Sequence, residues 1–163
     1  MFSAAVLTIS DKGFAGERED VSGVLIVKYL EEKGFDIKKY TVIPDEREII
    51  SKSLIEMCDE IKVDLVITTG GTGFSRRDVT PEATLDVIER NVPGIPEALR
   101  SRSLEITPKA MLSRGIAGIR KGTLIVNMPG SPKAVEEYLE ILLPVLPHAL
   151  SILTGRSAEC ARD

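Results

Sequence analysis

A short loop carries the residues with the strongest chemical signal. Residues 70–73 read Gly-Gly-Thr-Gly, and Arg76, Arg77 and Asp78 follow them. Three glycines exceed what a tight turn needs, and they let backbone N–H groups converge on an anion such as phosphate. Guanidinium groups pair with phosphate oxygens, and a carboxylate can bind Mg²⁺. The loop therefore indicates a phosphate site, and a valine at Gly71 should harm ligand binding more than folding.

This loop differs from the two commonest phosphate-binding motifs. A P-loop needs Gly-Lys followed by Ser or Thr, whereas this chain has Gly73, Phe74 and Ser75. A dinucleotide-binding fingerprint needs a further glycine where Arg76 stands. Neither a P-loop kinase nor a nicotinamide-dependent dehydrogenase is indicated.

Three other loops carry polar residues that could act at the same site. They hold Ser10 and Asp11, Asp45, and the turn at residues 129–131. Asp45 precedes Glu48 by three residues, which is the spacing of a helix capping box, so the residues alone favour capping. The serine at position 131 stays ambiguous, because a capping serine and a phosphate-binding serine use the same geometry at a helix start.

The elements around these loops alternate between apolar strands and amphipathic helices. This alternation is typical of βαβ units, so we expect an α/β fold of three layers, α/β/α, with a mostly parallel sheet. Ligands bind outside the carboxyl ends of such strands, and the four loops should meet there. We expect strands at residues 2–10, 36–43, 63–69 and 123–128, and helices over residues 21–30, after residues 44–48 and from Thr80, with Thr80 as N-cap before Pro81.

The C-terminal half departs from this alternation. Residues 95–106 have a helical pattern, and residues 113–120 pair with residues 123–128 across Lys121-Gly122, which suits a hairpin turn. A helix over residues 133–143 and a helical tail complete the chain. Because no linker or repeat interrupts residues 1–163, we expect a single domain.

Composition narrows the class of function. The net charge of −4 and the aromatic content of 4% favour neither backbone nor base contacts with nucleic acid. No segment suits a membrane span or a secretory signal, so we expect a cytoplasmic protein. The single histidine, His148, argues against serine-histidine and multi-histidine zinc mechanisms. Cys58 and Cys160 lie far apart and are expected to stay reduced.

The helix expected over residues 21–30 is unusually apolar. Its only charged residue is Lys28. Such a helix is buried either inside its own domain or against another subunit as well as the sheet, and the pattern leaves both possibilities open.

Several long motifs resemble one known family. The segments TTGGTGFSRRDVTPEAT at residues 68–84 and LSRGIAGIRKGTLIVNMPGSPKA at residues 112–134, with LTISD and VIPDE near the N-terminus, are similar to the MogA/MoaB family of molybdenum cofactor biosynthesis. The resemblance spans nearly the whole chain. It implies transfer of AMP from ATP to the terminal phosphate of molybdopterin, with release of pyrophosphate and with Mg²⁺ as cofactor.

The resemblance also implies roles for individual residues. Asp45 and Asp78 match the family's two catalytic, metal-linked aspartates, which raises Asp45 above the capping interpretation. A homotrimer is implied as well, together with a metal-insertion enzyme as a downstream partner. The matched substrate and nucleotide contacts are Ser10, Asp11, Gly70, Gly71, Thr72, Gly73, Ser103, Ser113, Pro129, Gly130 and Ser131. Arg76 and Arg77 are added to them by their own chemistry, as cationic groups directly after the glycines.

Two other functions compete with this one. A pterin-binding or scaffold module of the same family would bind the ligand without turnover, but the presence of both Asp45 and Asp78 argues against it. A nucleotide-pyrophosphate hydrolase of the related competence-damage type is expected to have further domains, for which 163 residues leave no room. The sequence does not distinguish a molybdenum pathway from a tungsten pathway.

Overall fold

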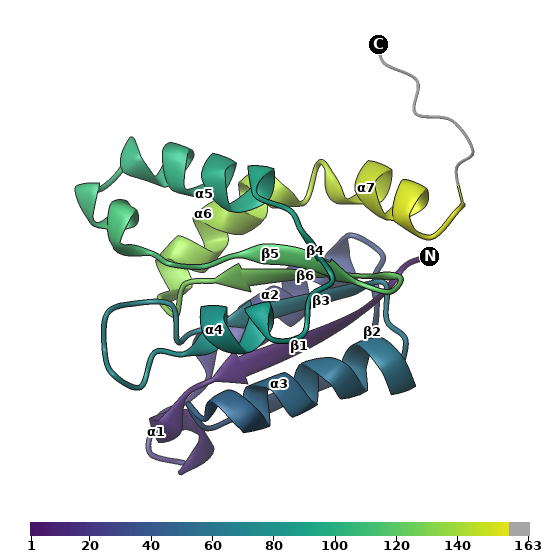
Figure 1. Ribbon diagram of the computed structural model, residues 1–163. Coiled ribbons are helices and arrows are strands. Elements are labelled where there is room, and N and C mark those ends of the chain that lie inside the picture. Colours follow the sequence, from purple (N-terminus) through teal and green to yellow (C-terminus); the bar gives the residue numbers. More distant parts are fainter. Residues whose placement is uncertain (157–163) are drawn as a thin grey trace.

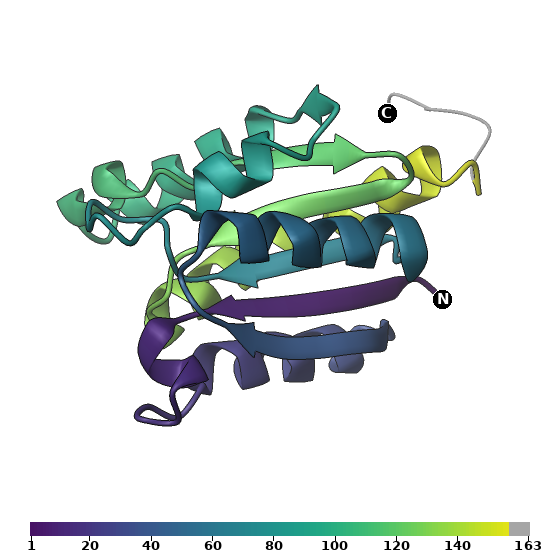
Figure 2. The same cartoon turned by 60° about the horizontal axis from the view of Figure 1, so that its bottom comes forward.

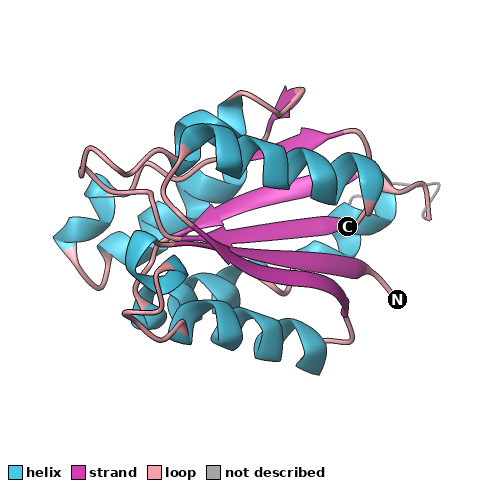
Figure 3. Cartoon of the chain, turned by 90° about the horizontal axis from the view of Figure 1, so that it is seen from below, coloured by secondary structure: helices cyan, strands magenta, loops and turns pink. Residues whose placement is uncertain are grey.

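The computed structural model describes residues 1–156, in which one sheet lies between two layers of helices (Figure 1). Figure 3 shows this three-layer arrangement along the sheet, and the predicted α/β/α class is confirmed. The strands are β1 (Ser3–Ile9), β2 (Asp36–Ile43), β3 (Leu65–Thr69), β4 (Arg90–Asn91), β5 (Ala117–Arg120) and β6 (Thr123–Met128). The helices are α1 (Asp11–Phe14), α2 (Val21–Glu32), α3 (Arg47–Ile55), η1 (Glu56–Glu60), α4 (Thr80–Leu85), α5 (Gly94–Leu104), η2 (Pro108–Leu112), α6 (Pro132–Leu142) and α7 (Leu146–Leu153).

The order of strands in the sheet explains where a ligand can bind. The order is β2-β1-β3-β6-β5-β4, with β2, β1, β3 and β6 parallel and the β5 and β4 pairings antiparallel. From β1 the chain crosses to β2 on one side and then returns to β3 on the other. The loops that leave β1 and β3 therefore diverge at their carboxyl ends, which is the switch point where open α/β sheets bind ligands.

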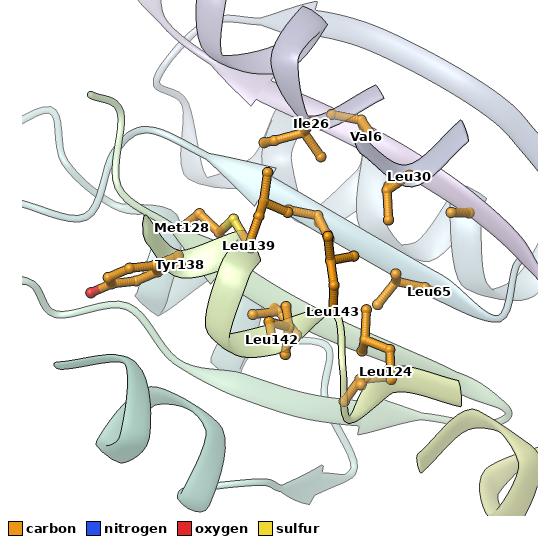
Figure 4. Packing of buried hydrophobic residues seen from close by; sticks show 14 of the residues in the cluster. Val6, Ile26, Leu30, Leu65, Leu124, Met128, Tyr138, Leu139, Leu142 and Leu143 are labelled. Carbon is orange, nitrogen blue, oxygen red and sulfur yellow. The ribbon is translucent and has the colours of Figure 1, made fainter. Parts of the chain in front are cut away.

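Two apolar clusters, one on each face of the sheet, hold the layers together. On one face α2, α5, α6 and α7 pack against the strands, and Figure 4 shows Ile26 and Leu30 of α2 near Val6, with Leu139 of α6 close by. On the other face α3 and α4 contribute Ile50, Leu54 and Ala83. Figure 2 shows α3 lying across this second face. Alternate residues of β1 enter the two clusters, as the period of two in a strand requires.

The local predictions hold for most elements, with three differences. The Lys121-Gly122 hairpin is present, and Lys121 has a positive φ of 51°. The helix after Asp45 ends in a π-helical turn over Glu56–Glu60 that periodicity did not indicate. Strand β5 begins at Ala117, four residues later than expected, and in the segment before it the Ser113 and Gly115 carbonyls accept hydrogen bonds from the Arg100 side chain. The two-residue strand β4 was not predicted.

Of the two cysteines and the single histidine, Cys58 and His148 lie within the described residues. Cys58 is buried and unpaired, and burial raises the pKa of its thiol to about 11, so it is a poor nucleophile. Cys160 lies outside the described residues. His148 is exposed on α7. No helix within residues 1–156 is long and apolar enough to cross a membrane.

Candidate active site

A cavity of about 550 Å³ opens at the carboxyl ends of the parallel strands. All four loops singled out from the sequence contribute to its lining, together with the start of α2. The lining residues are Thr8, Ile9, Ser10, Gly13, Arg18, Glu19, Asp20, Val21, Ser22, Asp45, Thr69, Gly70, Gly71, Asp78, Gly130, Ser131 and Pro132. Segments more than 100 residues apart in the chain thus form one site, as the parallel sheet predicts.

Asp45 stands at the end of β2 and is held by the loop after β1. Its Oδ2 accepts a hydrogen bond from the backbone N–H of Asp11 at 2.8 Å, and the Asp11 Oδ1 accepts one from the Asp45 N–H at 3.0 Å. Among the described residues no hydrogen bond uses the Asp45 Oδ1. Helix α3 has Glu46 at its N-cap and no side-chain cap, so the capping interpretation of Asp45 is wrong. The Asp45 carboxylate binds the loop after β1 instead.

The charge environment of Asp45 is unfavourable for its ionised form. Asp45 is half-buried, and loss of hydration raises the pKa of its carboxyl group above the ordinary value. The hydrogen bond from the Asp11 backbone lowers this pKa, whereas the negative charges of Asp11 and Asp78 raise it further. A positive charge placed between Asp45 and Asp78 would offset this repulsion.

Asp78 lies at the end of the glycine loop. Its Oδ2 accepts a hydrogen bond from the backbone N–H of Ser75 at 3.0 Å, and within the described residues its Oδ1 has no hydrogen bond. A Cβ atom at Gly73 would come within 2.9 Å of that Oδ2, so the glycine gives the carboxylate room. Each aspartate therefore has one oxygen fixed by a backbone N–H and one oxygen left for a ligand.

The two glycines at the end of β3 are required by backbone geometry. Gly70 and Gly71 have φ values of 95° and 70°, a region in which other residues are strained. A Cβ at Gly70 would lie 2.3 Å from the Ile9 carbonyl oxygen, and one at Gly71 would lie 2.2 Å from the Thr80 Oγ1. The Thr80 hydroxyl donates to the Gly70 carbonyl at 2.9 Å and does not cap α4, for which Val79 occupies the N-cap position.

The first turns of α2 and α6 face the cavity from the side of β1 and β6. Ser131 caps α6 by accepting from the Ala134 N–H at 3.3 Å, which confirms the capping interpretation, and it also lines the cavity. The Ser22 hydroxyl donates to the Gly130 carbonyl at 2.7 Å and ties the two helix starts together. Helix N-termini carry a partial positive charge that favours bound anions.

Asp20 closes the start of α2 in a different way. Its Oδ1 caps the helix by accepting from the Gly23 N–H at 2.9 Å, while its Oδ2 accepts from the Thr8 hydroxyl at 2.7 Å and from the Tyr40 hydroxyl. Its two oxygens are therefore engaged within the protein, in contrast to the free Oδ1 atoms of Asp45 and Asp78.

Some residues predicted for the site lie outside the cavity lining. Arg77 forms two hydrogen bonds of 3.0 Å with the Asp11 carboxylate and one of 2.8 Å with Glu46, and its bonds to Asp11 lower the pKa of that carboxyl group. Arg76 is exposed beside it. The two arginines are therefore not placed as anion-binding forks within the cavity. Asp11, Thr72, Gly73, Pro129, Ser103 and Ser113 also lie outside the lining.

Three of these outlying residues support the loops through their backbones. Thr72 and Gly73 accept hydrogen bonds from Arg114 at 2.9 Å, and the Pro129 carbonyl accepts from the Thr69 hydroxyl at 2.7 Å. Ser103 is buried on α5, and its hydroxyl has no partner among residues 1–156. Ser113 is half-buried directly after η2.

Sequence reasoning missed Arg18, Asp20, Ser22 and Arg114. Arg18 is the single Lys or Arg among the described residues that line the cavity. Asp20 could have been found, because it directly precedes the apolar helix that begins at Val21 and an aspartate is a strong N-cap. Arg18 carries no such signal, since a charged residue in a polar loop usually faces only solvent. Arg114 is found only once its contacts with the glycine loop are known.

A comparison with protein families agrees with this geometry. The family described as "Probable molybdopterin binding domain" matches residues 5–148, which include all the strands except the first two residues of β1 and all four cavity loops. The chain belongs to this family. Its resemblance to MogA and MoaB proteins is thereby confirmed.

Individual members of the molybdopterin-binding family are similar over most of the chain. The molybdopterin adenylyltransferase of Helicobacter pylori strain J99 is 46% identical over 152 residues, which cover 92% of this chain and 86% of that protein. Gephyrin of Dictyostelium discoideum is 44% identical over 93% of this chain, but the match covers 22% of that larger protein. The crystal structure of the molybdopterin biosynthesis enzyme MoaB from Thermus thermophilus has a TM-score of 0.90 at 50% identity, covering 95% of this chain and 98% of that one.

Proposed function

We propose that this protein is a molybdopterin adenylyltransferase, which transfers AMP from ATP to the terminal phosphate of molybdopterin. The observation that carries the proposal is the cavity at the β1/β3 switch point, which brings Asp45, Asp78 and the glycine pair together. The similarity to a molybdopterin adenylyltransferase over 92% of the chain supports the same reaction.

The chemistry needs little from the protein besides placement and charge. An oxygen of the molybdopterin phosphate attacks the α-phosphorus of ATP, a new P–O bond forms, and the bond to the β-phosphate oxygen breaks to release pyrophosphate. A phosphate monoester is largely ionised near neutral pH, because its second pKa is about 6, so no histidine base is required. Rate enhancement then comes from holding two polyanions in line and from stabilising the charge of the transferring group.

Asp45 and Asp78 fit a divalent cation such as Mg²⁺. Both present an Oδ1 that makes no hydrogen bond within residues 1–156, and carboxylate oxygen is the donor that Mg²⁺ prefers. Mg²⁺ is commonly held by one or two carboxylates together with substrate phosphates. When bound, Mg²⁺ would neutralise phosphate charge. The protein's own part is to fix both carboxylates through the N–H groups of Asp11 and Ser75.

Positive charge for the polyphosphate comes from two sources in the cavity lining. The Arg18 side chain is exposed, and no hydrogen bond or ion pair within the described chain engages it, so it is available to phosphate oxygens. The N-terminus of α6, with eleven residues, adds a partial positive charge beside Ser131. We assign Ser10, Gly70, Gly71, Gly130 and Ser131 to contacts with phosphate or pterin on the basis of their place in the lining.

The other residues predicted for the site are given different roles in this proposal. Asp11 and Arg77 are assigned to positioning Asp45, because their side chains are paired with each other. Ser103, Ser113, Thr72, Gly73 and Pro129 stay assigned to substrate or nucleotide contacts through the resemblance, and Arg76 stays assigned to them by its charge. We also propose a homotrimer, a cytoplasmic location where ATP is made available, and delivery of the adenylylated product to a metal-insertion enzyme.

Incubation with ATP, Mg²⁺ and molybdopterin tests the function directly. We expect adenylyl-molybdopterin and pyrophosphate in equal amounts, detected by mass spectrometry and by a coupled pyrophosphate assay. Consumption of ATP without the adenylylated product would indicate a nucleotide-pyrophosphate hydrolase. Tight molybdopterin binding without turnover would indicate a non-catalytic module of the same family.

A further inference from the structure

Arg114 makes an unusual set of contacts with the loop that carries Asp78. Its Nε donates to the Gly73 carbonyl at 2.9 Å, and its Nη2 donates to the Asp78 carbonyl at 2.7 Å. One planar guanidinium group therefore bridges the two ends of the loop from residue 73 to residue 78. The backbone N–H of Arg114 adds a third bond, to the Thr72 carbonyl at 2.9 Å.

The third side of the guanidinium group pairs with the helix that follows the loop. Arg114 Nη1 donates to both carboxylate oxygens of Glu82, in the first turn of α4. The positive charge of Arg114 is thus used inside the protein and is not directed into the cavity, whose lining does not include Arg114. These contacts point to a structural action on the loop, without direct contact with the substrate.

Arg114 is itself held in place from two sides. The Arg100 Nη1 on α5 donates to the Gly115 carbonyl at 2.7 Å and to the Ser113 carbonyl at 3.4 Å, on either side of Arg114. The Ile116 backbone exchanges hydrogen bonds with Asn127 of β6, one of which reaches the buried Asn127 side chain. A brace can orient a loop only if the brace is anchored, and this segment is anchored to both α5 and the sheet.

The loop needs such support because it makes few contacts of its own. Phe74 is 72% exposed, and residues 74–77 are all exposed. Its internal contacts are those between Ser75 and Asp78 and one weak bond of 3.4 Å at Arg77, and outside the loop the exposed Arg77 side chain pairs with Asp11 and Glu46. Exposed segments with few buried contacts open locally at low free energy.

From these contacts we infer that Arg114 is a positioning residue, which braces the Gly73–Asp78 loop so that the Asp78 carboxylate faces the cavity. A lysine cannot replace it, since one ammonium group cannot reach two carbonyls and a carboxylate in three directions. The effect of an Arg114 substitution on turnover rests on the proposed function, whereas its effect on the conformation of the loop does not.

Limited proteolysis measures the brace without any substrate. Arg76 and Arg77 make the loop a trypsin site, and cleavage of a native protein follows the population of the locally open form. In Arg114→Ala we expect cleavage after residues 76 and 77 to be about tenfold faster, the change that loss of one hydrogen bond to a charged group produces. Mass spectrometry of the fragments identifies the site. Arg102→Ala, which removes an exposed arginine from α5, is the matched control and should behave like the parent.

A further variant and a rescue experiment separate bracing from general stability. Arg114→Lys keeps the charge near Glu82 but not the fork, and we expect intermediate cleavage. Millimolar guanidinium ion should slow loop cleavage in Arg114→Ala and not in the parent. In the adenylylation assay the turnover of both variants should fall while the KM for ATP stays near the parental value, because Arg114 does not touch Arg18 or the α6 start.

Three results would overturn the inference. The first is a rate of loop cleavage in a folded Arg114→Ala that equals the parental rate. The second is an equal rise in the rate of cleavage at lysines and arginines throughout the chain. If Arg114→Ala does not fold, the third is a parental rate of loop cleavage in Arg114→Lys. Absence of adenylyl transfer in the parent would instead count against the proposed function, and the proteolysis result would still decide the role of Arg114.

Discussion

Two aspartates that the sequence places 33 residues apart face one cavity, and their surroundings differ. Asp45 is fixed by the Asp11 N–H and is half-buried, whereas Asp78 is fixed by the Ser75 N–H in an exposed loop. Both keep an oxygen available for a ligand. At the scale of residues the site therefore depends on backbone groups that hold carboxylates. The Arg77 side chain pairs with the Asp11 carboxylate, and the Arg114 side chain holds the Gly73 and Asp78 carbonyls on either side of Ser75.

For Asp78→Asn we expect turnover to fall by orders of magnitude while molybdopterin affinity changes little. Asparagine keeps the size and one oxygen but loses the charge that would bind Mg²⁺ where charge develops in the transition state. A loss of roughly 3 to 4 kcal/mol slows the reaction by about two to three powers of ten. Single-turnover adenylylation at saturating Mg²⁺ measures this, and a rate near that of the parent would remove Asp78 from the mechanism.

The pKa of Asp45 offers a second test at this scale. Burial and the charges of Asp11 and Asp78 raise it above 3.8, so the carboxyl group should titrate above that value in the ligand-free protein. Because the folded state then binds the proton more tightly than the unfolded state, this group lowers stability as pH rises through the interval between 3.8 and the raised pKa. Carboxyl-carbon NMR, with Asp45→Asn for assignment, measures the titration. In Asp78→Asn the pKa of Asp45 should move down, and an unchanged value would show that the two charges do not interact.

Arg18 should matter for the nucleotide more than its exposed position suggests. In Arg18→Gln we expect the KM for ATP to rise about tenfold, since a hydrogen bond between charged groups is lost in binding. Lys12→Gln removes a nearby exposed charge that does not line the cavity and is the control. Equal KM values in the two variants would leave Arg18 without a role in binding.

At the scale of elements, the glycine loop has a structural requirement that the sequence did not reveal. Valine at Gly71 was expected to harm binding more than folding. The positive φ and the 2.2 Å approach of a Cβ to the Thr80 Oγ1 indicate that even alanine disturbs the fold, because Thr80 must move and its bond to Gly70 is lost. The anion-binding geometry and the packing of β3 against α4 thus depend on the same residue.

Gly16 provides a matched control for this effect. It also has a positive φ, 76°, but nothing lies within 4 Å of the Cβ position. Gly16→Ala should lower the free energy of unfolding by about 1 kcal/mol, the cost of the backbone conformation alone. Gly71→Ala should lower it by about 2 kcal/mol or more, since a clash and a lost hydrogen bond are added. Urea denaturation of both variants measures the difference, and equal losses would show that Thr80 yields without cost.

At the scale of the whole molecule, helix α2 is only partly covered by its own domain. Ile26 and Leu30 are fully buried against the sheet, while Val21 and Val24 are 50% and 55% exposed. The sequence left open whether this helix is buried inside its own domain or also against another subunit. Within the single chain, one side of the helix is buried against the sheet. The other side is the surface on which the proposed trimer would rest.

We expect the protein to be a trimer in solution, with a mass about three times 17.8 kDa. A charge at a buried interface is costly, so Val24→Asp should dissociate the trimer. Val145→Asp introduces the same charge at a valine of similar exposure, 53%, far along the chain, and should leave the trimer intact. Light scattering at micromolar concentration checks all three proteins. A monomeric parent, or a trimer in both variants, would contradict the prediction.

The sequence by itself determined the layers of the fold and the four loops of the site. Apolar runs of strand length, helical periodicity and glycine-rich strand ends are local signals, and the rule that ligands bind at the carboxyl ends of parallel strands converts them into one predicted rim. The family resemblance added the identity of the two aspartates, which the local capping signal at Asp45 had obscured.

Only the tertiary structure decided which polar groups are available and which are already engaged. Arg77 looked like an anion-binding residue but pairs with Asp11 and Glu46, whereas the unremarked Arg18 lines the cavity. Arg114 lies 36 residues from Asp78 in the chain and still supports its loop. Pairing between charged groups depends on distances across the sheet, and no local pattern of residues contains those distances. For this reason the sequence predicts where the site lies, whereas the pairing of its charged groups is known only from the folded structure.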